Sequence, residues 1–203
     1  MKPMNPLLTA AVAVALCMIL PGCGGKTVTR LDQDTVTDLS GRWNDTDSRI
    51  VAEEMIRDCL SRPWIRQHVL TEGRIPVIVV GAVRNKTMEH IPVDTFIKSI
   101  EREFINSGDV KVVADAGERA DIRTEREEMR GNVTAETLKR FGRETGADFV
   151  LTGAIQQIVD EEGRRKVSFY QTDLELIHVE SNEKKWIGTK RIKKDIDRAR
   201  FSG

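Results

Sequence analysis

The stretch Pro76-Val77-Ile78-Val79-Val80-Gly81 decides the fold class, because it is a continuous apolar run between two residues that interrupt regular structure. A short run without polar alternation predicts a buried central strand. A polar loop containing Asn85 follows, then a helix with apolar residues at helical spacing over residues 93–104, then a short strand over 110–114. Strand, helix and strand in this order predict a parallel pair of strands.

The C-terminal part of the chain predicts three further strands, over residues 148–159, 166–180 and 184–192. The segments between them are short and contain Gly163 or Asn182, which favours an antiparallel meander. Combined with the parallel pair, this predicts a single α/β domain with a mixed sheet of about five strands packed by helices.

Helices are also expected on both sides of the first strand. One carries Val51, Met55 and Cys59 on an apolar stripe, and a shorter one runs from Trp64 to Leu70. Another amphipathic helix is predicted from Thr134 to Thr145. Cys59 lies on the apolar stripe, so core packing is favoured over a reactive thiol.

The N-terminus has the anatomy of a signal peptide. Lys2 supplies a positive charge, and residues 7–20 form an apolar run too short to span a bilayer permanently. The sequence Leu20-Pro21-Gly22-Cys23 resembles the lipobox of bacterial lipoproteins, in which the cysteine receives a diacylglycerol and the preceding peptide is removed. The alternative is an ordinary secretory signal with an incidental cysteine.

These features predict four regions: a lipoprotein signal peptide over residues 1–22, a lipidated flexible tether over 23–42, a globular domain over 43–195 and a tail over 196–203. The tether has few large apolar residues and no helical period. Its 20 or so residues could extend to about 70 Å at most. The globular part is therefore expected to remain close to the membrane that holds the lipid.

Composition and motifs favour binding over catalysis. The 32 acidic and 32 basic residues cancel, so the excess positive charge of nucleic-acid-binding proteins is missing. The three histidines are scattered, and on a strand His178 would face away from Asp173 and Glu175. No phosphate-binding loop or nucleophile elbow occurs. We therefore expect no catalytic residue, no metal, no cofactor and no small-molecule substrate.

The segment over residues 117–130 combines helical spacing with almost no apolar face. Four arginines spaced 4, 3 and 4 residues apart would share one side of this helix: Arg119, Arg123, Arg126 and Arg130. A helix so polar on all sides needs neighbours, ion pairs or a partner to hold it. It is either an arginine-rich contact surface or a solvated helix that keeps the protein soluble.

The order of several motifs resembles the family of LpoB-type penicillin-binding-protein activators, whose domain is similar to the N-terminal domain of TolB. The resemblance spans about residues 41–194. It is carried by residues 41–47, Cys59-Leu60, Pro63-Trp64, residues 76–81, Asn85-Lys86-Thr87, residues 104–108, residues 146–153, and residues 176–180 before Trp186.

The resemblance implies an outer-membrane lipoprotein that faces the periplasm, binds a class A penicillin-binding protein, and stimulates its activity without being an enzyme. Asn85 and the four arginines are the predicted docking surface. The short tether also favours an alternative, an adaptor in another envelope complex. An envelope hydrolase has no supporting set of residues.

Overall fold

The computed structural model describes residues 28–32, 35–129 and 146–197 of the 203-residue chain. The chain divides into a unit that ends at Thr35 and a second unit that begins at Val36. Within the first unit, the described residues are exposed and belong to no helix or strand. The helix predicted from Thr134 to Thr145 lies outside the described residues.

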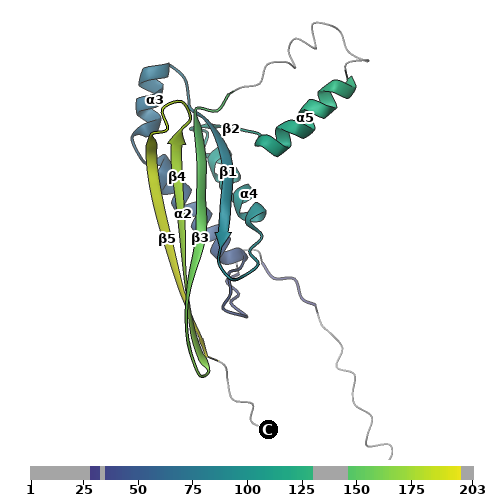
Figure 1. Ribbon diagram of the computed structural model, residues 1–203, viewed down its shortest axis with the longest axis vertical. Helices are drawn as coiled ribbons and strands as arrows, with labels where there is room; N and C mark the ends of the chain where they lie inside the picture. Colours follow the sequence, from purple (N-terminus) through teal and green to yellow (C-terminus); the bar gives the residue numbers. More distant parts are fainter. Residues whose placement is uncertain (1–27, 33–34, 130–145, 198–203) are drawn as a thin grey trace, which may run out of the picture. The chain divides into compact units, whose positions relative to one another are not determined.

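The second unit contains a mixed five-stranded sheet in the order β2-β1-β3-β4-β5 (Figure 1). β1 runs parallel to both neighbours, whereas β3, β4 and β5 form the predicted antiparallel meander. The strands are β1 (Val77–Lys86), β2 (Lys111–Val113), β3 (Phe149–Glu162), β4 (Arg165–His178) and β5 (Lys184–Asp197). The predicted fold class, a single α/β domain with a mixed sheet, is confirmed.

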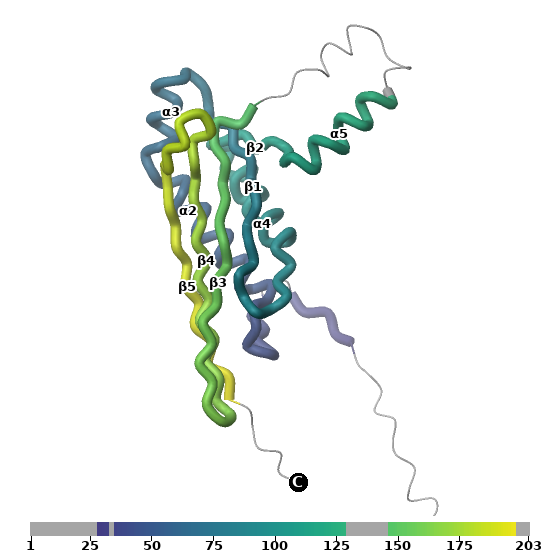
Figure 2. Tube along the Cα trace, in the orientation of Figure 1, coloured from purple at the N-terminus to yellow at the C-terminus, as the bar shows by residue number. Residues whose placement is uncertain are grey.

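The helices over the described ranges are α2 (Asp45–Leu60), α3 (Trp64–Glu72), α4 (Val93–Ser107) and α5 (Ala116–Met129). Figures 1 and 2 show α2 and α4 side by side behind the sheet. Asn44 begins α2 through a capping box with Asp47, and Gly108, at φ 74°, ends α4 in the left-handed conformation.

Three strands extend beyond their predicted ends: β1, β5, and β3, which continues past residue 159 to Glu162. β1 continues through Lys86, so Asn85 lies in a strand and not in the predicted loop. β5 continues to Asp197, past the predicted end at residue 192. The extensions of β3 and β5 are rich in charged residues, and that of β1 contains Arg84 and Lys86. Each extension pairs with a neighbouring strand through its backbone. An edge strand such as β5 also tolerates lysine and arginine on its solvent side.

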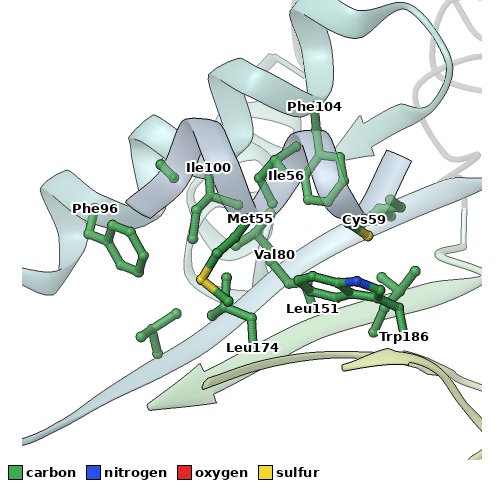
Figure 3. Packing of buried hydrophobic residues seen from close by; sticks show 14 of the residues in the cluster. Met55, Ile56, Cys59, Val80, Phe96, Ile100, Phe104, Leu151, Leu174 and Trp186 are labelled. Carbon is green, nitrogen blue, oxygen red and sulfur yellow. The ribbon is translucent and has the colours of Figure 1, made fainter. Parts of the chain in front are cut away.

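The hydrophobic core lies between the sheet and the α2–α4 pair (Figure 3). Met55, Ile56 and Cys59 of α2 meet Phe96, Ile100 and Phe104 of α4 above side chains of the sheet: Val80, Leu151, Leu174 and Trp186. Cys59 is fully buried, and burial raises the pKa of its thiol to about 12. The expected core role of Cys59 is confirmed.

Neighbouring residues on α4 offer a matched test of this core. Phe104 is fully buried, whereas Ile105 is 58% exposed. We expect Phe104→Ala to lower the free energy of unfolding by about 3–5 kcal/mol, because the cavity cannot be refilled by close-packed neighbours. The control Ile105→Ala should change it by less than about 0.5 kcal/mol. Urea unfolding followed by tryptophan fluorescence measures both, and equal effects would contradict the assigned core.

Candidate functional site

Asn85 organises a tight loop at the end of β1. Its Oδ1 accepts hydrogen bonds from the Thr87 backbone N–H at 2.9 Å and from the Thr87 hydroxyl at 2.7 Å. Its Nδ2 donates to the Glu89 carbonyl oxygen at 2.7 Å. The Thr87 hydroxyl oxygen also accepts from the Glu89 N–H at 3.1 Å. Short polar side chains thereby fix the backbone of residues 85–89, the last two residues of β1 and the turn that follows them. We call this segment the β1 loop.

The Glu89 carboxylate joins this loop to the body of the domain. It accepts hydrogen bonds from the Tyr170 hydroxyl at 2.7 Å, the Gln157 side-chain amide at 2.8 Å and the Trp43 backbone N–H at 3.1 Å. Burial by itself would raise the pKa of Glu89, but these three donors outweigh it and lower the pKa. The β1 loop is therefore held to β3, β4 and the start of the domain by an ionised carboxylate.

Met88 projects from the β1 loop into solvent. Its side chain is 83% exposed, although its neighbours Thr87 and Glu89 are both bonded within the protein. The Met88 backbone N–H points to the Gln157 side-chain oxygen at 3.4 Å. An adaptable apolar side chain on a fixed backbone is suited to contact with a partner.

The arginine-bearing segment forms α5, as predicted, and its first turn is well anchored. Asp115 and Glu118 exchange capping hydrogen bonds, 2.8 Å from the Glu118 N–H to Asp115 and 3.1 Å from the Asp115 N–H to Glu118. Glu118 also pairs with Lys98 of α4. Arg119, Arg123 and Arg126 follow on this helix. Arg130 lies outside the described residues, and so does Cys23.

The structure does not bring Asn85 together with the start of α5. β2, which leads into α5, ends opposite Val79 of β1, and Asn85 lies six residues further along β1. At about 3.3 Å per residue, this is a separation of roughly 20 Å along the strand. The residues predicted to form one docking surface therefore lie at two separate places, the β1 loop and α5, and their role in docking stays a prediction.

A hollow of about 440 Å³ lies at the other end of the sheet, between α3 and the β4–β5 turn. The rings of Trp64, His68 and His178 pack edge-on around Phe149, with centroids 5.1–5.3 Å from it. Burial lowers the pKa of His68, although the charge of Asp148 acts in the opposite direction. Within the described ranges, no group of three or more His, Cys, Asp or Glu residues is arranged to hold a metal.

Comparison with known proteins identifies the family. The family model described as peptidoglycan-synthase activator LpoB matches residues 47–192. The chain belongs to the LpoB family. The resemblance carried by the sequence motifs is thereby confirmed, and the family description assigns its members to the activation of peptidoglycan synthases.

Solved structures of LpoB are among the structural matches. The NMR structure of E. coli LpoB is 14% identical, with 98% of this chain and 90% of that chain covered and a TM-score of 0.39. The LpoB C-terminal domain from Salmonella enterica is 16% identical, covering 64% of this chain and 93% of that chain, with a TM-score of 0.34. Lipoprotein GNA1162 from Neisseria meningitidis is 14% identical, covering 62% and 88%, with a TM-score of 0.37. A search of curated proteins found no match.

Sequence reasoning named Asn85 in this LpoB-family domain but missed Met88 and Glu89. A glutamate in a polar loop has no pattern that distinguishes it from a solvated one, and a single methionine there has no period. The only available signal was the Asn-x-Thr spacing of residues 85–87, which is typical of a side-chain-bonded turn. Among the helices of the described ranges, none is both long and apolar enough to cross a membrane.

The charge of Glu89 gives a prediction with a defined pH dependence. Because its pKa is lowered from an ordinary value of 4.5, its contribution to stability is present above about pH 4.5 and is lost as the pH falls through the lower folded value. We expect Glu89→Gln to lower the free energy of unfolding at pH 7 by about 1–3 kcal/mol. The difference from the unmodified protein should shrink towards pH 3.

Urea unfolding at several pH values measures this effect. Glu180→Gln is the matched control, because Glu180 is exposed in the β4–β5 turn. A pH-independent loss for Glu89→Gln would show that the carboxylate charge is not what the three donors stabilise.

Proposed function

We propose that the protein is a lipid-anchored regulator that binds and activates a class A penicillin-binding protein. The observation that carries this proposal is the family match over residues 47–192, which spans α2 to β5. The family description names peptidoglycan synthases as the targets of activation. The regulator acts by contact and not by catalysis, so it must bind one state of the synthase more tightly than another.

The β1 loop supports a docking role through its shape and rigidity. Asn85, Thr87 and Glu89 fix its backbone, and Met88 is presented at 83% exposure. A pre-organised loop loses little conformational entropy on binding, so more of the contact energy contributes to affinity. The β1 loop is therefore the first docking surface.

α5 supports a second contact. α5 is composed mostly of polar and charged residues, and over residues 116–128 Ile122, at 42% exposure, is the one large apolar side chain. The helix is anchored through Glu118 in its first turn. Arginine is enriched at the centres of protein interfaces, where its planar head and apolar stem both make contact. Arg119, Arg123, Arg126 and Arg130 are assigned to this second surface.

The location follows from the lipobox-like sequence at Cys23. A diacylglycerol on this cysteine would anchor the protein to the outer membrane, facing the periplasm. The tether over residues 23–42 would then set how far the domain reaches, up to about 70 Å when fully extended. Regulation of the synthase would depend on that reach.

Two substitutions at separate places test the docking surfaces. We expect Met88→Asp to weaken synthase binding about tenfold or more, because it buries a charge in the contact. The combined change of Arg119, Arg123 and Arg126 to Glu should weaken it if α5 also docks. Leu70→Asp is the matched control, because Leu70 is an apolar residue of α3 with 76% exposure. The measurements are affinity for a purified class A synthase and the rate of glycan polymerisation.

Each outcome assigns a surface or removes one. If the unmodified protein neither binds nor accelerates any class A synthase, the proposed function is wrong. If Met88→Asp leaves the affinity unchanged, the β1 loop is not a docking surface. If the triple arginine change leaves the affinity unchanged, α5 is not a docking surface.

The lipid anchor has an independent test. We expect Cys23→Ser to move the protein from the membrane fraction to the soluble fraction of the cell envelope, because the thiol is the site of acylation. Fractionation followed by mass spectrometry of the N-terminal peptide measures this. Cys59→Ser is the control for loss of a cysteine as such, and continued sedimentation of Cys23→Ser would contradict the anchor.

A further inference from the structure

Residues 37–42, which we call the strap, lie against the domain without forming a helix or strand. They belong to the second unit, although the sequence predicts a flexible tether through residue 42. The one large apolar side chain of the strap, Leu39, is 95% exposed. Burial of apolar surface therefore does not hold the strap in place.

Polar contacts to two residues hold it instead. Lys194 of β5 donates to the Asp38 carboxylate at 2.6 Å and to the Arg42 carbonyl oxygen at 3.1 Å. Asn44 donates from its side-chain amide to Asp38 at 2.7 Å and to the Thr37 carbonyl oxygen at 3.1 Å. Asp38 is the centre of the attachment, and its side chain is 48% exposed. A half-exposed ion pair of this kind contributes modestly and is weakened by salt.

The domain keeps its own hydrogen bonds when the strap is removed. Lys194, with a side chain 9% exposed, also pairs with the buried Asp47 at 2.6 Å, so its charge retains a partner. The side-chain oxygen of Asn44 still accepts from the Asp47 N–H at 3.0 Å and caps α2. Opening the strap therefore leaves no buried charge unpaired, which makes an open state accessible.

The packing between strap and β5 is also incomplete. A hollow of about 380 Å³ lies between residues 38–41 and residues 193–197. The close contact within this region is at Gly41, whose φ is +66° and where an added Cβ would lie 2.3 Å from Ile196 Cγ1. Closure of the strap thus requires a glycine at this position.

Trp43 marks the end of the releasable part. Its N–H donates to Glu89 at 3.1 Å, its indole N–H donates to Ser48 at 2.7 Å, and its ring packs edge-on against Tyr170 with centroids 5.6 Å apart. A residue held by its backbone and by two side-chain contacts is expected to stay in place when the residues before it move. A hinge in this segment would therefore lie between Arg42 and Trp43.

We propose that the strap opens and closes, and that opening lengthens the tether between the lipid and the domain. Six more residues add about 20 Å of reach when extended. With the strap closed, a tether of the fourteen residues 23–36 could extend to about 50 Å at most. This consequence for reach rests on the proposed anchoring at Cys23, whereas the opening itself does not.

Two substitutions open the strap by different routes. Asp38→Asn removes the charge that Lys194 binds, and Gly41→Ala introduces a clash with Ile196 in a left-handed backbone. Leu39→Ala is the matched control within the strap, because its side chain lies in solvent. We expect amide hydrogen exchange over residues 37–42, and tryptic cleavage after Arg42, to accelerate about three- to tenfold in both variants. The control should match the unmodified protein.

The experiment uses the full chain in detergent. Exchange in peptides of α4 and β4 from the same sample serves as the internal reference for the folded domain. In the unmodified protein, 1 M NaCl should accelerate exchange of the strap and leave the references unchanged. Fully unprotected exchange of the strap in the unmodified protein, or equal rates in all variants, would overturn the proposal. Acceleration of the α4 and β4 peptides together with the strap would also overturn it, because the strap would then be part of the global fold. None of these readouts depends on synthase activation.

Discussion

Glu89 accepts hydrogen bonds from three parts of the chain that are far apart in the sequence: Trp43, Gln157 and Tyr170. Replacing a carboxylate that accepts from three donors lowers the stability of the fold more than replacing a solvated carboxylate, because each donor would lose its partner. The start of the domain, the end of β1 and the middle of the β3–β4 hairpin are thus held at one point. Both the β1 loop and the hinge at Trp43 take their positions from this carboxylate.

The family to which the chain belongs is described by an activating role, and two exposed features of the domain are suited to contact with a partner. The family is one of peptidoglycan-synthase activators, and the match extends over residues 47–192. Within the described residues, features that point outward are a rigid loop with an exposed methionine and an arginine-bearing helix anchored at one end. An activator needs a surface that fits one state of its target, and rigidity of that surface improves the distinction between states.

The sequence predicted the parts of this fold that depend on burial. The apolar run at residues 77–80 became β1, a strand with a neighbour on each side, and the four-residue spacing that includes Cys59 marked the core face of α2. Polar contacts were missed, because a glutamate bonded by three donors and a solvated glutamate look the same in a sequence. The attachment of residues 37–42 was missed for the same reason: it depends on Lys194, a lysine in a strongly charged strand. The end of β5 was missed because charged residues there obscured the alternation.

β5 is an edge strand of the sheet and is fourteen residues long, and among the described residues no strand lies on one side of its backbone. A long unpaired edge normally invites a second copy to add a strand and start a fibre. This edge strand carries six lysine and arginine residues: Lys184, Lys185, Lys190, Arg191, Lys193 and Lys194. Two such edges repel each other on approach, so the same charges that obscured the end of this strand in the sequence protect molecules at high concentration from aggregation.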